Sequence, residues 1–240
     1  MRFLPTFFIA TLFAAGLPQI ALAQDTKTLP IDELIQRAEQ GNAEAQFHLG
    51  NKYYNGKDIK QDSAEAFKWY KKAAEQGYAK AQFNLGSAYS FGRGTAQNDE
   101  EAVKWYRKSA EQGVPNAQFN LGNAYLKGKG VKQDHVEAFD WFKKAAEQGY
   151  ANAQYNLGNA YSFGQGIKQN NEEAVKWYRK AAEQGVAVAQ FNLADAYYHG
   201  EGVKQDYAEA FKWFQKAAEQ GYVKAQFNLS MLYEDGHGVA

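Results

Sequence analysis

The chain alternates between two kinds of amphipathic segment that recur along most of its length. In the first kind, Ala45, Leu49 and Tyr53 follow one another at four-residue intervals, which places them on one face of a helix. In the second kind, Ala66 and Ala73 share a side with a tryptophan, whereas lysines and glutamates occupy the other side. The pattern predicts an all-α chain built from pairs of amphipathic helices.

The helix pairs repeat with a period of 36 residues, marked by one tryptophan in each repeat: Trp69, Trp105, Trp141, Trp177 and Trp213. A fixed period of this size is typical of solenoid proteins, and we expect each tryptophan to fill the wedge between neighbouring units. Aligning the tryptophans gives five complete units and a partial one: 42–77, 78–113, 114–149, 150–185, 186–221 and 222–240. We expect residues 24–41 to hold a lone helix of the second kind that caps the first unit.

Glycine and polar residues predict where each helix begins and ends. After each first helix comes a loop such as 128–134, in which paired glycines supply the positive φ angles that turn the chain. An Asp or Asn with a Glu three residues later then precedes each second helix, at Asp62 and Glu65, Asn98 and Glu101, Asp134 and Glu137, Asn170 and Glu173, and Asp206 and Glu209. This spacing predicts capping boxes, in which both side chains satisfy free backbone amides at the helix start.

A weaker period of 72 residues is superimposed on the first. Units two and four are identical at 28 of 36 positions, whereas units one, three and five share a Glu-Ala-Phe segment that the other two lack. The array is therefore expected to have grown by duplication of a two-unit block. Exposed features should alternate along it.

Composition excludes several classes of function. The chain has 27 Lys and Arg against 27 Asp and Glu, so its net charge is zero and a surface for nucleic acid is disfavoured. Neutrality also disfavours a groove specialised for strongly charged ligands. Cysteine is absent, which excludes disulfides, thiolate metal sites and cysteine nucleophiles.

The first 23 residues have the features of a secretory signal peptide. Arg2 precedes an apolar run over residues 3–17, and Ala21-Leu22-Ala23 fits a small-residue cleavage site. We expect cleavage after Ala23 and a soluble product that is periplasmic or secreted. No segment is long and apolar enough to predict a transmembrane anchor.

The repeated positions together read A-x-A-Q-x-x-L-G-x-x-Y-x-x-G-x-G-V-x-x-D-x-x-x-A-x-x-W-x-x-x-A-A-x-x-G, with departures at Asp58, Thr95, Ala194 and Ser230. In this pattern the chain resembles the Sel-one-like repeat family, relatives of the tetratricopeptide repeat, over essentially all of 31–240. The resemblance implies a right-handed α/α superhelix, or solenoid, whose first helices line a concave face. It also implies an adaptor or scaffold that binds a protein or peptide, in bacteria often in the envelope.

Candidate binding residues follow from the helical geometry. With Leu49 as the buried centre of its helix, Phe47 and Asn51 lie about 160° away on either side and point away from the partner helices. The equivalent positions form an aromatic row of Phe47, Phe83, Phe119, Tyr155, Phe191 and Phe227. Beside it lies a polar row of Asn51, Ser87, Asn123, Asn159 and Asp195. A third group consists of Tyr54, Tyr198, Phe91 and Phe163. Rings flanked by amides suit a peptide or partner helix. Alternatively, the rings pack against the first helix of the next unit.

The sequence indicates no catalytic residue, metal site or cofactor. Its four histidines stand in different units, no serine has the Ser-x-x-Lys spacing, and Gly-x-Ser-x-Gly does not occur. The alternative function is a cell-envelope enzyme or ligand-binding protein that acts on peptidoglycan or β-lactams; a purely structural spacer is a third. The chain stops before a sixth second helix, so we expect Leu229, Leu232 and Tyr233 to lack cover and the last layer to be marginal or to support self-association.

Overall fold

The computed structural model describes residues 26–234 and residue 236, and within this part every regular element is helical. A short 3-10 turn, η1, is followed by helices α1 to α12. Their bounds are η1 Thr26–Thr28, α1 Ile31–Glu39, α2 Ala43–Asn55, α3 Ser63–Glu75, α4 Ala79–Phe91, α5 Asp99–Glu111, α6 Pro115–Lys127, α7 His135–Glu147, α8 Ala151–Phe163, α9 Asn171–Glu183, α10 Ala187–His199, α11 Tyr207–Glu219 and α12 Val223–Glu234.

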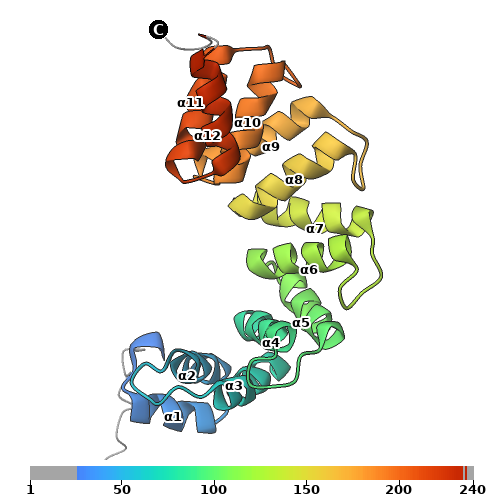
Figure 1. The fold of residues 1–240 in the computed structure, drawn as a ribbon. Coiled ribbons are helices and arrows are strands. Elements are labelled where there is room, and N and C mark those ends of the chain that lie inside the picture. Colours follow the sequence, from blue (N-terminus) through green and yellow to red (C-terminus); the bar gives the residue numbers. More distant parts are fainter. Residues whose placement is uncertain (1–25, 235, 237–240) are drawn as a thin grey trace, which may run out of the picture.

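Each helix packs mainly against the helices that precede and follow it in the chain. Figure 1 shows the result, a curved array that runs from α1 at one end to α12 at the other. The even-numbered helices from α2 onward are the predicted first helices, and the odd-numbered ones from α3 onward are the second helices. The predicted all-α solenoid is confirmed.

The N-terminal cap has the predicted form. Helix α1 buries Leu34 and Ala38 against Ala45 and Leu49 of α2, in the place that a preceding second helix would occupy. The predicted signal peptide lies outside the described residues. Among the helices that the structure describes, none is long and apolar enough to cross a membrane.

The second helices begin as predicted, but the capping boxes are only half formed. Asp134 accepts hydrogen bonds from the backbone amides of Val136 and Glu137, at 2.9 and 3.1 Å. In a capping box the Glu137 side chain would in turn accept from the Asp134 amide. That amide instead donates to the Tyr125 carbonyl oxygen at 3.0 Å, and the Glu137 carboxylate accepts from the Trp141 indole at 3.1 Å. The reciprocal half of the prediction is therefore wrong.

The 72-residue period corresponds to two ways of packing one unit on the next. In odd-numbered units a phenylalanine of the second helix meets a tyrosine of the next first helix edge to face, as Phe67 meets Tyr89 with ring centroids 5.3 Å apart. In even-numbered units a valine takes that place, and an arginine, such as Arg107, donates to the hydroxyl of Tyr125 and lies 5.5 Å from its ring centroid. The tryptophans contribute to the remaining interface: Trp105 of unit two belongs to the same buried cluster as Ala66 and Ala73 of unit one.

A ladder of buried glutamines joins successive units. Gln118 of α6 donates to the Ala110 carbonyl oxygen at 3.1 Å and accepts from Gln148 at 2.8 Å. The same pair of bonds recurs at the other buried glutamines, Gln46, Gln82, Gln154 and Gln190. Each glutamine thereby gives a second donor to a carbonyl at the C-terminal end of the preceding helix, which also accepts from the backbone amide of the glycine that follows that helix.

Replacing one glutamine of the ladder should destabilise the array measurably. Gln118→Met retains most of the buried volume but removes one of the two donors to the Ala110 carbonyl, which keeps its bond from the Gly113 backbone amide. We expect a loss of about 0.5–1.5 kcal/mol in the free energy of unfolding, the usual net contribution of one hydrogen bond. Urea unfolding followed by circular dichroism measures it, and Gln148→Met, which changes the exposed partner, should cost less. Equal losses would show that the ladder's buried bond is not the important one.

Candidate binding groove

Five cavities lie along the first helices of the array, with volumes of about 450, 190, 210, 140 and 50 Å³. Every one is lined by at least one asparagine of a first helix. In the order of the volumes given, these include Asn51, Asn84 and Asn120 in the first cavity, Asn192 in the second, Asn120 and Asn123 in the third, Asn228 in the fourth, and Asn156 and Asn159 in the fifth. We call this surface the first-helix groove.

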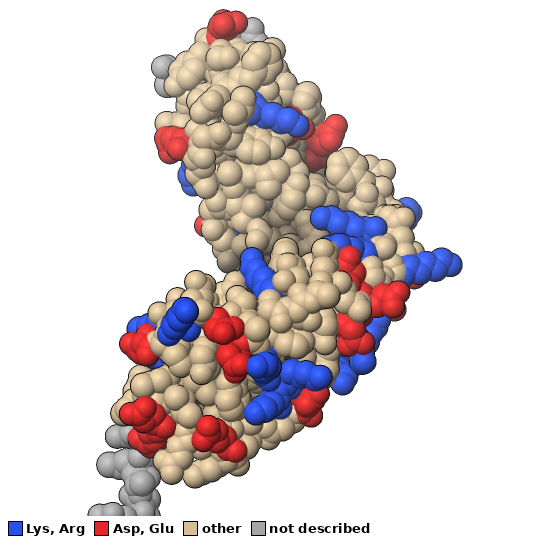
Figure 2. Space-filling model, turned by 60° about the horizontal axis from the view of Figure 1, so that its bottom comes forward, with Lys and Arg blue, Asp and Glu red and all other residues tan. Residues whose placement is uncertain are grey.

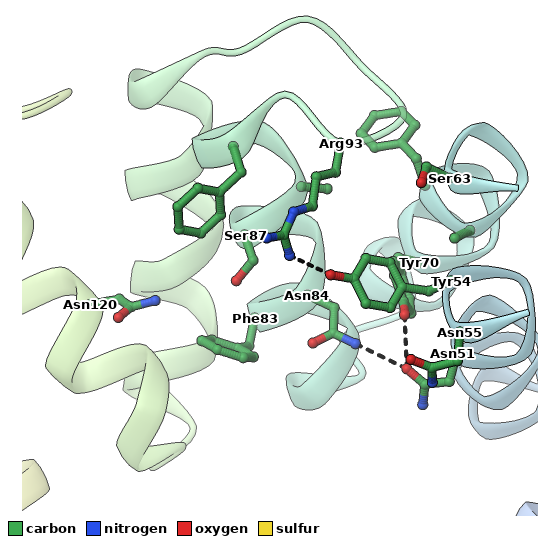
Figure 3. Close-up of a pocket in the computed structure, with 14 residues that line it drawn as sticks. Asn51, Tyr54, Asn55, Ser63, Tyr70, Phe83, Asn84, Ser87, Arg93 and Asn120 are labelled. Atoms are coloured by element: carbon green, nitrogen blue, oxygen red, sulfur yellow. Dashed lines mark hydrogen bonds between the residues drawn. The ribbon is translucent and has the colours of Figure 1, made fainter. Parts of the chain in front are cut away.

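The largest cavity lies between α2 and α3 on one side and α4 and α6 on the other (Figure 3). Asn51 lies at its base, where its side-chain oxygen accepts from the Tyr70 hydroxyl at 2.8 Å and from the Asn84 amide at 3.2 Å. Arg93 reaches across the mouth and donates to the Tyr54 hydroxyl. The cavity is therefore lined by groups that can both donate and accept hydrogen bonds.

The predicted polar row lines the groove, and most of its members accept hydrogen bonds from second-helix tyrosines or from asparagines of the next first helix. Asn159 accepts from the Tyr178 hydroxyl at 2.8 Å and from the amide of Asn192 at 3.5 Å. Ser87 and Asn123 occupy the same position, and each accepts one such bond, Ser87 from a tyrosine hydroxyl and Asn123 from an asparagine amide. Asp195 continues the row into the cavity between α9 and α10.

Sequence analysis missed a second polar row in the same groove. Its members are the asparagines that follow the aromatic residue in the repeated segment: Asn84, Asn120, Asn156, Asn192 and Asn228. The signal was present, because Asn recurs there in five of six units while His48 stands in the first. Three of these asparagines donate to the first polar row of the preceding unit, and together the two rows form a band of amides.

The aromatic row does not project freely from the array. Phe47 is half-buried, its ring centroid 6.2 Å from that of Tyr70 on the unit's own second helix and 5.2 Å from that of Tyr78, which precedes the next first helix. The expectation that these rings point away from the partner helices is therefore wrong. Phe83, Phe119, Tyr155 and Phe191 are half-buried in the same way, and Phe227 of α12 is exposed.

Phe83 differs from most of the aromatic row because it also lines the largest cavity. In its unit the residue before the next first helix is Val114, so the ring lacks the second aromatic neighbour that Phe47 and Phe119 have in Tyr78 and Tyr150. The contribution of the row to the groove is therefore concentrated at this position.

The third group of candidates is divided between the surface and intramolecular contacts. Phe91 and Phe163 are 64% and 69% exposed and line cavities at the ends of α4 and α8. Tyr54 is held by Arg93, whose guanidinium carbon also lies 4.9 Å from the Phe91 ring centroid. Tyr198 packs edge to face on Tyr207, with ring centroids 5.3 Å apart.

Two buried tyrosines at the base of the groove keep their protons well into the alkaline range. Burial raises the pKa of Tyr70 above its ordinary value, and hydrogen bonding to Asn84 opposes that shift. Burial raises the pKa of Tyr178 to about 12, against weaker opposing bonds to Ser162 and Asn192. Both hydroxyls therefore act as donors at neutral pH, which fixes Asn51 and Asn159 as acceptors.

The raised pKa of Tyr178 predicts alkaline instability. The folded state favours the neutral hydroxyl, so this stabilisation is complete below pH 10 and is lost as the pH rises from 10 toward 12. We expect Tyr178→Phe to reduce the alkaline fall in unfolding free energy by about 1–2 kcal/mol. Urea unfolding at pH 7 and pH 11.5 measures it. The loss at pH 7 measures the missing hydrogen bond to Asn159 alone. Phenylalanine fits this position of the repeat, because Phe142 occupies it in the preceding unit. An unchanged alkaline loss would contradict the assignment.

No group of three or more His, Asp or Glu side chains that could hold a metal occurs in the described residues. His48 lies 3.9 Å from Glu44 and His199 lies 3.6 Å from Asp195, each a single pair on one helix. The side chains that line the groove are mainly amides, hydroxyls, rings and isolated charges.

The stacked helix pairs and the amide-lined groove define an α-solenoid of the tetratricopeptide-like class. The chain belongs to the Sel1 repeat family, whose profile matches residues 43–78, 79–114, 115–150, 151–186, 187–222 and 223–240. Members of this family serve generally as scaffolds for protein interactions. No curated protein is significantly similar to the chain.

Solved structures show the same fold. A Sel1 repeat protein from Oxalobacter formigenes is 38% identical with a TM-score of 0.78, and the match covers 87% of this chain and 83% of that one. The c5321 protective antigen of uropathogenic Escherichia coli, described as displaying an SLR fold, is also 38% identical with a TM-score of 0.74. That match covers 87% of this chain and 52% of the antigen, so this chain spans about half the antigen's length.

Proposed function

We propose that this chain is a non-enzymatic scaffold that binds an extended peptide or a partner helix in the first-helix groove. The observation that carries the proposal is the band of amides formed by the two polar rows along α2 to α10. Family membership supports a scaffold, since interaction is the general role of these repeats.

The chemistry of the band suits a peptide main chain. An asparagine side chain carries both a donor and an acceptor, as a peptide group does, so it can pair with a backbone of any sequence. The exposed rings of Phe91 and Phe163 add apolar area at the margins of three cavities. Main-chain pairing would supply affinity, and side-chain contacts in the cavities would supply specificity.

The test uses two matched double variants on the same helices. Asn120→Ala with Asn156→Ala removes groove amides of α6 and α8, whereas Asn116→Ala with Asn152→Ala removes exposed amides of those helices outside the five cavities. After crosslinking and pull-down from an extract of the periplasm, we expect partners captured by the wild type to be lost only from the groove variant. Identical partner lists for both variants would overturn the proposal. Equal helical content by circular dichroism controls for folding.

We further propose that the mature protein acts in the periplasm or outside the cell. The support is the N-terminal sequence, with its basic start, apolar run and Ala21-Leu22-Ala23 site. N-terminal sequencing of the protein recovered from the periplasm should find Gln24 first. Recovery of an uncleaved chain from the cytoplasm would contradict this location.

The alternative of an enzyme or ligand-binding protein acting on peptidoglycan or β-lactams has no specific observation in its favour. The largest cavity, of about 450 Å³, is the place to test this alternative, because two serines, Ser63 and Ser87, line it. Ser87 accepts a bond from Tyr106, and no lysine lines that cavity to serve as a base. Acylation of the protein by a labelled β-lactam would favour this alternative.

Helix α12 supports a proposal of self-association. Leu232 is fully buried, contrary to expectation, because it packs into the core of unit five, whereas Leu229 is only half-buried and Tyr233 is exposed. Val223 and Phe227 are 73% and 64% exposed on the same helix. We expect the protein to associate through this face, and Phe227→Glu to yield a smaller species by light scattering. A wild-type monomer at high concentration would remove the proposal.

A further inference from the structure

One loop position changes charge progressively along the array. The residue that follows the first glycine after each first helix is Lys57, Arg93, Lys129, Gln165 and Glu201 in units one to five. The order is therefore positive in three units, neutral in the fourth and negative in the fifth. Elsewhere charges are mixed: on the face drawn in Figure 2, basic and acidic side chains lie close together over much of the lower part.

The change of charge enters the groove itself. The cavities of about 210 and 190 Å³ are equivalent sites 72 residues apart, and they share the ring of Phe91 or Phe163 and the hydroxyl of Ser90 or Ser162. Their charged residues differ. The first is lined by Lys127, Lys129 and Asp99, with Lys129 lying 3.1 Å from the Asp99 carboxylate, and the second is lined by Asp195 and Glu201.

The remaining cavities extend this contrast. The largest, in units one and two, has Arg93 as its charged side chain. The smallest, between units three and four, is lined by Asn156, Asn159 and Gln165, with His135 beside them. The cavities at the loops of units two and three therefore have excess positive charge. The cavity between units three and four has no Lys, Arg, Asp or Glu in its lining, and the cavity at unit five is negatively charged.

The acidic cavity has the features of a site that binds a cationic side chain of a protein ligand. Burial raises the pKa of Asp195 above its ordinary value, the nearby His199 lowers it, and the like charge of Glu201 raises it. Asp195 and Glu201 line the same cavity, so their like charges repel, and His199 lies 3.6 Å from Asp195 on the same helix. A cationic side chain bound between them would relieve this repulsion.

We propose that the groove selects an extended peptide whose acidic side chains lie toward one end and whose basic side chains lie toward the other. The acidic end would lie on Arg93, Lys127 and Lys129, and the basic end on Asp195 and Glu201. This inference rests on the proposed function and adds to it the chemistry and the direction of the partner. Charge complementarity of this kind fixes register and orientation more than it adds affinity.

The geometry also sets the spacing of the charges. The two equivalent cavities are two units apart. Neighbouring first helices meet through their side chains, as Asn192 meets Asn159, so we take their spacing as roughly 10 Å, the upper end of the range for packed helices. The charged ends of the peptide should then be about 20 Å apart, which an extended chain spans with about six residues. Shorter spacings would leave one end without a partner.

The test compares peptides of equal composition. One carries two glutamates and two lysines at opposite ends, separated by about six uncharged residues, with both termini blocked. The other carries the same residues with alternating charges. At low ionic strength we expect the first to bind the full chain about tenfold more tightly, and Arg93→Glu with Lys129→Glu to remove that advantage. Raising the salt concentration should weaken the preference.

Direction is read from a photo-crosslinker at the glutamate end. In the wild type we expect crosslinks to units two and three. In the fourfold variant Arg93→Glu, Lys129→Glu, Asp195→Lys and Glu201→Lys, which retains zero net charge, we expect restored affinity with crosslinks moved to unit five.

Three results would overturn the inference: equal binding of the two peptides, crosslinks that do not move in the reversed variant, or no saturable binding of either peptide. None of them decides the proposed function, which depends on capture of partners through Asn120 and Asn156. Conversely, equal capture by the two asparagine variants would refute the proposed function whatever the peptides do.

Discussion

Gly130→Ala is expected to destabilise the array by about 3–5 kcal/mol. Gly130 has a φ of +70°, which an L-residue adopts only with strain. A Cβ atom there would also lie 2.2 Å from the carbonyl oxygen of Asp99, at the start of α5 in the preceding unit. Because the obstacle is backbone, neither side can yield without separating two units.

Gly149→Ala is the matched control. Gly149 has a φ of +88°, but a Cβ atom there would have no neighbour within 4 Å. Its substitution should therefore show the conformational cost alone, about 1 kcal/mol. Thermal and urea unfolding of both variants measures the difference. Equal losses would mean that the close approach of the loop to α5 does not hold the units together.

Unit one provides a natural variant of the same loop position. Asp58 stands where Gly94, Gly130, Gly166 and Gly202 stand in later units, with a φ of +66°. In those units the glycine meets the first residue of a preceding second helix, whereas α1 begins at Ile31 and has no residue at the equivalent place. Asp58 instead pairs with Lys52. In unit one a side chain therefore stands on the same left-handed backbone, at a place that α1 does not reach.

These glycines show how far sequence reasoning reaches. Their role in the turn could be predicted, because helix ends and turns depend on residues a few positions apart. The contact that makes glycine obligatory at Gly130 joins residues of two units. The helix pairs, the N-caps and the N-terminal cap were predictable because they depend on such local patterns. The reciprocal half of the capping box was not predictable, because its outcome depends on a neighbouring helix. The amide of Asp134 is taken by Tyr125, an acceptor from the preceding helix.

The groove illustrates the same division. A helical wheel places Phe47 and Asn51 relative to their own helix, but it does not contain Tyr70 or Tyr78, the rings that cover Phe47. Asn84 was predictable in principle from its recurrence, and its role became evident only with its bond to Asn51. Net charge misled in a related way, since a total of zero conceals opposite charges in cavities two units apart.

Leu121→Ala is expected to reduce the free energy of unfolding by about 3–4 kcal/mol, and Leu229→Ala by about 1 kcal/mol. The two leucines occupy the same position of the repeat. Leu121 is fully buried at the centre of a cluster that includes Tyr106 and Phe142 from the helices on either side. Leu229 is half-buried, because in the described part of the chain α12 packs mainly against the helices of the preceding unit.

The position of the substitution should also change the form of the unfolding transition. In a solenoid each unit is stabilised by its immediate neighbours, so a defect in unit three weakens the coupling between the two halves of the array. Leu121→Ala should therefore broaden the urea transition, with a lower apparent m value, whereas Leu229→Ala should only fray one end. Circular dichroism follows the helices, and tryptophan fluorescence reports on all five complete units. If both variants kept the wild-type m value and lost equal stability, the array would unfold as one cooperative block, and the thin interfaces between units would be stronger than their alanine-rich composition indicates.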